Sequence, residues 1–142
     1  SPTDLEAFTK EVLSVCRPSG SKVLVNTHID IADRVGADGV HLNSVQLKSI
    51  THRPEVALCA ASCHSKEDLV RVDALALDFA VLSPIKVTAS HPDAIPIGWN
   101  LFASLIGGVK TPVYALGGLS KEELSDAWAH GAAGISMLRG AW

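Results

Sequence analysis

The sequence predicts an α/β fold in which buried parallel strands alternate with helices. Short apolar runs rich in β-branched and small residues alternate with segments of helical spacing, as is typical of βαβ units. A helix end, a tight turn and a buried strand also recur in similar form at residues 36–42, 76–82 and 131–137. Such a repeated pattern is expected of a fold built from repeated structural units. Shared turn chemistry is the alternative explanation.

The individual elements follow from caps, periodicity and chain breakers. The first helix begins either at Ser1, with Pro2 in its first turn, or at Thr3, with Glu6 closing a capping box. Serine caps and apolar spacing predict further helices at residues 29–35, 65–75, 99–106 and 120–129. Strands are expected at residues 22–26, 39–42, 56–61, 79–82, 113–116 and 134–138, with a long loop at 83–98.

About six strands after an initial helix leave two architectures open. One is an open, doubly wound sheet, and the other is a (β/α)₈ barrel that lacks its first two strands. In either case the strands at residues 22–26 and 134–138 would be edges of the sheet. Open edges favour association, so we expect a homo-oligomer or an upstream segment that covers them.

Composition narrows the possible functions. The 142 residues suffice for one domain with a hydrophobic core, so residues 1–142 are expected to form a single unit. A net charge of −3 and a pI near 6.0 give no electrostatic reason to bind nucleic acid or an anionic membrane. Three cysteines without metal-ligand spacing indicate reduced thiols in a cytoplasmic protein. No apolar run approaches the length of a membrane-spanning helix.

Two glycine turns follow the last two expected strands. Gly117 and Gly118 come after one strand, and Arg139 and Gly140 come after the other. Because the carboxyl ends of parallel strands share one edge, backbone N–H groups of both turns, including that of Leu138, can bind one anion. Arg139 adds positive charge. The sequence therefore predicts a phosphorylated ligand, although tight turns alone, or an ion pair for Arg139, would also explain these residues.

Five pieces of the sequence together resemble the thiamine phosphate synthase superfamily. They are residues 23–42, the Ala61-Ser62-Cys63-His64-Ser65 turn, and residues 79–91, 113–118 and 134–140. Their order and spacing carry the resemblance over nearly the whole chain. It implies a TIM (β/α)₈ barrel, here incomplete at its N-terminal side, because the family's first two strands and their Gln-x-Arg motif are absent.

A narrower likeness involves residues 83–85, 88–92 and 98–99 and the ending Leu138-Arg139-Gly140-Ala141-Trp142. These segments are similar to a bacterial subgroup in which this domain follows a Nudix hydrolase domain of the 8-oxo-dGTP-cleaning type. The likeness implies a native polypeptide that is longer at its N-terminus.

The resemblance also implies a reaction and a metal. Thiamine phosphate synthases join a pyrimidine pyrophosphate to a thiazole phosphate and hold Mg²⁺ with two aspartates. Thr27 and Gln46 stand at those two positions here, and neutral oxygens bind Mg²⁺ poorly. We therefore expect no metal and no other cofactor. Asn26, which the family also has, is expected to contact the substrate, although it could only satisfy backbone groups at a strand end.

The family's pyrophosphate loop is altered as well. Thr88 and Ser90 keep hydroxyl donors, but His91 stands where the family has lysine. Histidine is only partly charged at neutral pH, which weakens the case for synthase activity. We expect all three residues to contact a small phosphorylated thiazole or pyrimidine; ordinary loop residues are the alternative.

Thiazole tautomerases, sister proteins of the same fold, also lack the two aspartates. They isomerise a thiazole phosphate carboxylate with a histidine that His64 matches. Imidazole suits proton transfer between ring carbons, so His64 is the predicted acid/base and Ser62 beside it a predicted ligand contact. A purely structural role for His64 at the turn is the competing interpretation.

Three functional hypotheses follow. The first is a thiamine-biosynthesis domain that binds a thiazole phosphate and acts as a metal-free tautomerase. The second is a non-catalytic phosphate-binding module of a Nudix hydrolase fusion. The third is a Mg²⁺-dependent thiamine phosphate synthase with a remodelled metal site, which the missing carboxylates make the weakest.

Overall fold

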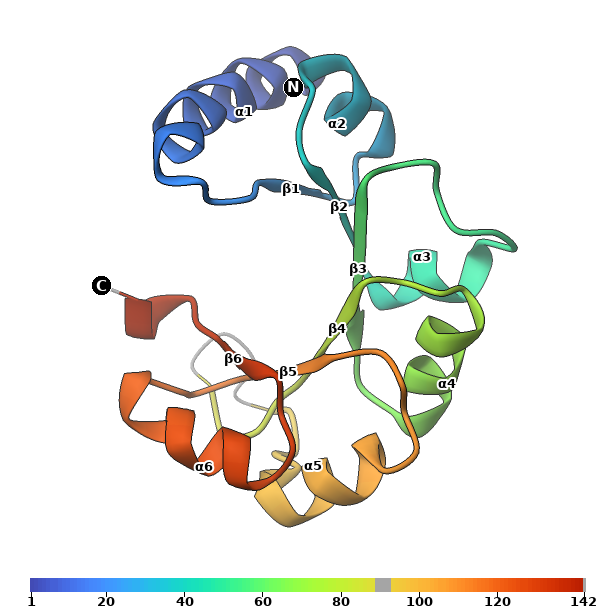
Figure 1. The fold of residues 1–142 in the computed structure, drawn as a ribbon, viewed down its shortest axis with the longest axis vertical. Helices are drawn as coiled ribbons and strands as arrows, with labels where there is room; N and C mark the ends of the chain where they lie inside the picture. The colour runs from blue at the N-terminus through green and yellow to red at the C-terminus, as the bar shows by residue number, and fades with distance from the viewer. Residues whose placement is uncertain (89–92, 142) are drawn as a thin grey trace.

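The computed structural model describes residues 1–88 and 93–141, which form one curved parallel sheet with its helices on the outside (Figure 1). The strands are β1 Leu24–Asn26, β2 Gly39–Leu42, β3 Leu58–Cys63, β4 Phe79–Leu82, β5 Val113–Leu116 and β6 Gly134–Ser136. Each strand pairs with the next in sequence, in the order β1-β2-β3-β4-β5-β6. The α/β fold predicted from the sequence, with six parallel strands, is confirmed for the described residues.

The first helix precedes the first strand, and the other helices cross over between strands; all of them lie on the convex side of the sheet (Figure 1). They are α1 Pro2–Cys16, α2 Ile29–Val35, α3 Ser44–Ser49, α4 Lys66–Ala74, α5 Gly98–Ile106 and α6 Leu124–Ala129, with 3₁₀ turns η1 Arg17–Ser19, η2 Lys121–Glu123 and η3 Arg139–Ala141. Within residues 1–88 and 93–141, none of the helices has the length and hydropathy that a membrane crossing requires.

Helix starts agree with the capping signals in the sequence. Ser1 caps α1 through a capping box with Asp4, so the first of the two predicted starts is correct and the Thr3 start is wrong. Ser120 and Glu123 form the predicted capping box ahead of α6, although its first turn is the 3₁₀ turn η2.

The strand bounds differ from the sequence-based expectation at three places. Strand β1 begins at Leu24 rather than at residue 22, because the Val23 N–H donates to the Asp38 carboxylate (2.9 Å) instead of joining the sheet. Strand β3 spans residues 58–63 rather than 56–61, so Ser62 belongs to the strand and not to the turn after it. Strand β6 ends at Ser136, and η3 follows it.

Helix α3 was not expected from the sequence. It has only six residues, too few for a clear apolar period. Asn43 caps it in a reciprocal box with Gln46, and Leu47 is its fully buried anchor. A capping box with Asn and Gln in place of Ser and Glu was the available signal.

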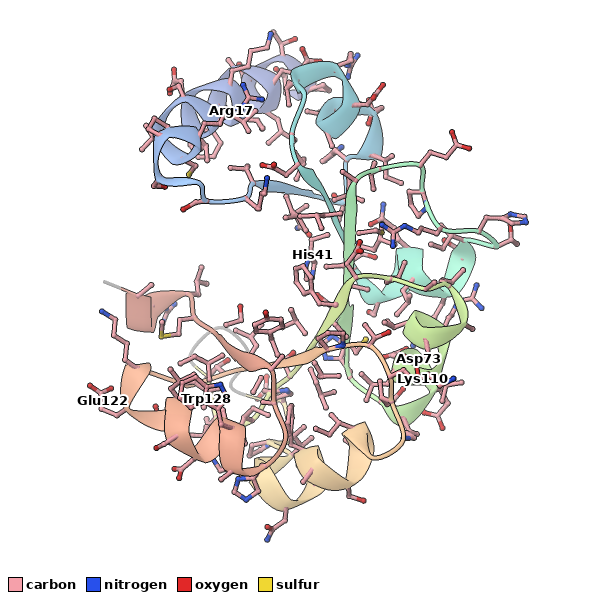
Figure 2. All side chains as sticks on the ribbon, viewed as in Figure 1. Arg17, His41, Asp73, Lys110, Glu122 and Trp128 are labelled. Atoms are coloured by element: carbon pink, nitrogen blue, oxygen red, sulfur yellow. The ribbon has the colours of Figure 1, made fainter. Side chains whose placement is uncertain are left out.

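Alternation along the strands gives the sheet two different faces. Outward-facing residues pack against the helices and form the core, which includes Val40, Leu42, Cys59, Ala61, Cys63, Ala80, Leu82, Val113 and Ala115. Phe102 of α5 is the largest side chain in this layer and is fully buried. The inner face instead carries half-buried residues such as His41, Ser62 and Tyr114, and Figure 2 shows His41 on the concave side. The core therefore lies on the convex side of the sheet, between the strands and the helices.

Candidate functional site

A cavity of about 1080 Å³ lies at the carboxyl ends of β3, β4, β5 and β6. Its lining residues are Ser62, His64, Ser83, Pro84, Val87, Thr88, Asp93, Ala94, Leu116, Gly117, Gly118, Leu119, Ser136, Met137, Leu138, Arg139 and Gly140. Ligands of parallel α/β sheets and barrels bind at this edge because the loops after all strands meet there.

Most residues predicted for the site meet in this cavity. The predicted acid/base His64, the neighbouring Ser62 and the loop residue Thr88 line it together with both glycine turns. Asn26 does not line it: this residue is exposed at the end of β1, and its backbone oxygen accepts from the His28 N–H. Ser90 and His91 lie outside the residues that the structure describes.

His64 follows directly after β3, and its ring orientation is fixed by the neighbouring strand end. Nδ1 lies 3.0 Å from the Ser83 carbonyl oxygen, which can only accept a hydrogen bond. The Ser83 hydroxyl oxygen lies farther from Nδ1, at 3.4 Å. In the neutral ring, the shorter contact to the carbonyl oxygen favours a proton on Nδ1, which leaves Nε2 as an unprotonated acceptor. His64 thus has the tautomer that a general base requires.

The backbone of His64 is held from the first turn of α4. Its N–H donates to Oδ2 of Asp68 (2.9 Å), a carboxylate that is only 2% exposed. Ser65 caps the same helix by accepting from the Asp68 N–H. The other oxygen of Asp68 lies 3.4 Å from Lys48 Nζ, close enough for an ion pair, but it accepts no hydrogen bond from the described residues. The backbone of His64 is therefore fixed by a hydrogen bond to a buried carboxylate.

The first glycine turn packs tightly on the loop after β4. A Cβ at Gly117 would lie 2.8 Å from Pro84 Cα, and one at Gly118 would lie 2.8 Å from the Val87 oxygen. Both glycines also have positive φ angles, +115° and +65°. Only glycine combines this backbone with such close approach, so the turn brings bare main chain to the cavity wall.

Two features make this wall suitable for an anion. Within residues 1–88 and 93–141, the N–H groups of Gly117, Gly118 and Leu138 donate to no protein acceptor. Arg139 is exposed at the same wall and forms no ion pair with a described residue. Free N–H donors next to an unpaired guanidinium fit a phosphate group.

The two positions that would supply carboxylates to Mg²⁺ are engaged with each other. Gln46 Nε2 donates to the Thr27 carbonyl oxygen (2.8 Å), and Gln46 Oε1 accepts from the Asn43 N–H (3.3 Å). Among the described residues, no three His, Cys, Asp or Glu side chains are grouped to hold a metal ion. Neutral, already bonded oxygens do not fit Mg²⁺, which prefers carboxylates.

Cys63 lies next to His64 in sequence but faces the other way. Its side chain is fully buried in the helix-facing core. Burial, with the nearby Asp68 carboxylate, raises the pKa of the Cys63 thiol to about 12, so it stays protonated at neutral pH. A Cys63–His64 nucleophile pair is therefore excluded by alternation along β3.

Several lining residues were not singled out from the sequence. Ser83 and Ser136 lie at or just after the ends of β4 and β6, and Leu116 ends β5. Their position at strand ends was the signal, because residues there share one edge of a parallel sheet. Asp93 also lines the cavity and adds a carboxylate that the sequence pattern did not indicate.

Comparisons with known proteins agree with this architecture. The family model described as thiamine monophosphate synthase matches residues 1–141. A candidate thiamine-phosphate synthase of Aquifex aeolicus is 37% identical over 140 residues, which cover 95% of this chain and 75% of that protein. The thiamine-phosphate synthase of Methanoregula boonei is 30% identical, over 96% of this chain and 65% of its own length. This chain therefore spans only part of these relatives.

A solved structure gives the same result at the level of the fold. Thiamine phosphate pyrophosphorylase from Pyrococcus furiosus superposes with a TM-score of 0.79 at 24% identity, over 96% of this chain and 67% of that one. The six strands of this chain therefore correspond to part of a TIM-barrel-like fold.

Proposed function

Since the chain belongs to the thiamine monophosphate synthase family, we propose that it binds a thiazole phosphate and moves a proton on its ring without a metal ion. The observation that carries this proposal is the cavity that His64 lines together with the two glycine turns. A phosphate on the N–H groups and Arg139 would anchor the ligand. The ring would then lie within the same cavity as His64.

The proton transfer needs only His64. Nε2 takes a proton from one ring carbon as that C–H bond breaks, and the resulting imidazolium returns a proton to the second carbon. The Ser83 carbonyl oxygen stabilises the imidazolium because it accepts from Nδ1 throughout. The net change is an isomerisation in which no atom is gained or lost.

Absence of a metal is part of the proposal. The Gln46–Thr27 hydrogen bond occupies the two positions where the family resemblance expects carboxylates. A second candidate function, synthesis of thiamine phosphate, is favoured by the names of the relatives. It would require pyrophosphate release that depends on a divalent ion. The link to a Nudix domain stays a prediction from the sequence.

Calorimetric titration of a thiazole phosphate carboxylate, with and without Mg²⁺, tests the proposal. We expect binding that is independent of Mg²⁺ and that Arg139→Ala weakens about tenfold, as for loss of one charge-assisted hydrogen bond. His64→Ala should keep binding but abolish proton exchange at the ring in D₂O, followed by NMR. His52→Ala, an exposed histidine outside the cavity, is the matched control.

Two results would change the assignment. Pyrophosphate release that requires Mg²⁺ would favour the synthase. Binding without proton exchange, unaffected by His64→Ala, would favour a non-catalytic phosphate-binding module.

A further inference from the structure

His41 and Ser62 form a polar pair on the inner face of the sheet. His41 Nε2 lies 2.8 Å from Ser62 Oγ, across neighbouring strands β2 and β3. Ser62 lines the cavity, whereas His41 is not among the residues that line it. Figure 2 shows His41 on the concave side of the sheet. Ser62 therefore lies between His41 and the cavity.

The imidazole of His41 is neutral at physiological pH. Burial lowers the pKa of His41, because the charged form loses hydration on the inner face. Among the described residues, none places a carboxylate in an ion pair with it. A neutral ring has one N–H donor and one acceptor nitrogen, so the contact to Ser62 has a direction.

The direction of the hydrogen bond between His41 and Ser62 depends on the second ring nitrogen of His41, Nδ1. Nδ1 has no hydrogen-bond partner within residues 1–88 and 93–141. An orphaned N–H is rarer in proteins than an acceptor with an unused lone pair, which favours the tautomer with Nδ1 as the acceptor. Nε2 then carries the proton and donates it to Ser62 Oγ. The hydroxyl proton of Ser62 is left free.

We infer that His41 is a positioning residue that makes Ser62 a hydrogen-bond donor to an acceptor group of the ligand. The acceptor is a carboxylate or a ring nitrogen, and this part of the inference rests on the proposed thiazole ligand. The neighbouring His64 has the opposite polarity, since its free Nε2 accepts. The end of β3 thus presents a donor at Ser62 and an acceptor at His64, two residues apart on one face.

The tautomer can be measured in the free protein. Long-range ¹H–¹⁵N spectra of histidine-labelled protein should show Nε2–H for His41 and Nδ1–H for His64. Ser62→Ala should shift the His41 resonances and leave those of His52 unchanged. A protonated Nδ1 on His41, or no response to Ser62→Ala, would overturn the inference whether or not any thiazole binds.

The ligand part is tested with a matched pair of probes, a thiazole phosphate with a ring carboxylate and one without it. Wild type should prefer the carboxylate, and Ser62→Ala and His41→Leu should each reduce this preference about tenfold, as for one hydrogen bond to a charged group. His41→Gln, whose amide can still donate to Ser62, should restore most of it. His52→Leu is the control.

Equal loss in His41→Leu and His41→Gln would overturn the positioning role. If neither probe binds while the His41 tautomer is as expected, the proposed function fails and the ligand part of the inference fails with it. The hydrogen-bond assignment within the free protein would then stand alone.

Discussion

Gln46 Nε2 donates a 2.8 Å hydrogen bond to the carbonyl oxygen of Thr27 and so ties the start of α3 to the segment after β1. The same side chain closes the capping box of α3 with Asn43. Both polar atoms of Gln46 are therefore used for structure. The family resemblance expects metal-binding aspartates at Thr27 and Gln46. In this chain the two residues instead form a neutral hydrogen bond between the segment after β1 and helix α3.

This connection predicts that divalent ions have no effect on the wild-type protein. The thermal unfolding temperature should be the same in EDTA and in millimolar Mg²⁺ or Mn²⁺. The double variant Thr27→Asp with Gln46→Asp supplies two carboxylates and should gain a rise in unfolding temperature with Mn²⁺, because ions that bind only the folded state stabilise it. A wild-type protein that Mg²⁺ stabilises would contradict a metal-free site.

Thr27 also predicts a stabilising substitution. It is a β-branched residue at φ +65°, in the left-handed region that such residues rarely adopt. Thr27→Asn, which tolerates this region better, should raise the free energy of unfolding by about 0.5–1 kcal/mol. The same change at Thr51, whose φ is negative, should not stabilise. Urea unfolding measures both, and a loss of stability at Thr27 would show that the threonine side chain has a packing role.

The glycine turn predicts a difference between two alanine substitutions. Gly118→Ala combines φ +65° with a Cβ 2.8 Å from the Val87 oxygen, whereas Gly20→Ala at φ +73° meets nothing within 4 Å. Gly20→Ala should cost about 1 kcal/mol of stability, from the backbone alone. Gly118→Ala should cost roughly 1–3 kcal/mol more, from the added overlap, and should weaken phosphate binding. Urea unfolding measures both losses of stability. If Gly118→Ala and Gly20→Ala cost the same, the loop after β4 can move away from the added methyl group at little energetic cost.

Local signals in the sequence were sufficient for most of the fold. The cap at Ser1 was one of two helix starts that the sequence offered, and the turn at Gly117 was predicted from an apolar run that ends at two glycines. Both signals lie within a few residues of the features that they predict. Helix α3 could not be placed this way, because six residues give too little periodicity. The shift of β3 to residues 58–63 likewise depends on pairing with β2 and β4, which is a tertiary effect.

The site was only partly predictable for a related reason. His64 could be located from its motif, but its tautomer depends on the Ser83 carbonyl oxygen, which lies 19 residues away in sequence. The contact between His41 of β2 and Ser62 of β3 joins residues 21 apart in sequence, so no short sequence pattern indicates it. Such pairings arise from sheet register, so they become visible only when the strands are assembled.

The two ends of the sheet predict association. Among the described residues, β1 pairs only with β2 and β6 only with β5, which leaves one side of each strand open. We propose that a second copy of the chain, or a further segment of the polypeptide, covers these edges. Light scattering coupled to size exclusion should show that residues 1–142 associate as concentration rises. Leu24→Lys should reduce association, and a stable monomer at every concentration would contradict the proposal.

The ion pair between Lys86 and Glu123 predicts acid sensitivity next to the glycine turn at Gly117 and Gly118, against which Lys86 packs. With the N–H and hydroxyl of Ser120, Lys86 lowers the pKa of Glu123 from 4.5 to about 2. Because the folded-state pKa is the lower one, the stabilisation is full above pH 4.5 and is lost as pH falls toward 2. Glu123→Gln should therefore lower the unfolding temperature at pH 7, and its difference from wild type should close within this acid window. Glu11→Gln, on the exposed face of α1, is the control. A difference between wild type and Glu123→Gln that is constant from pH 7 to pH 2 would show that the glutamate acts through its shape and not through its charge.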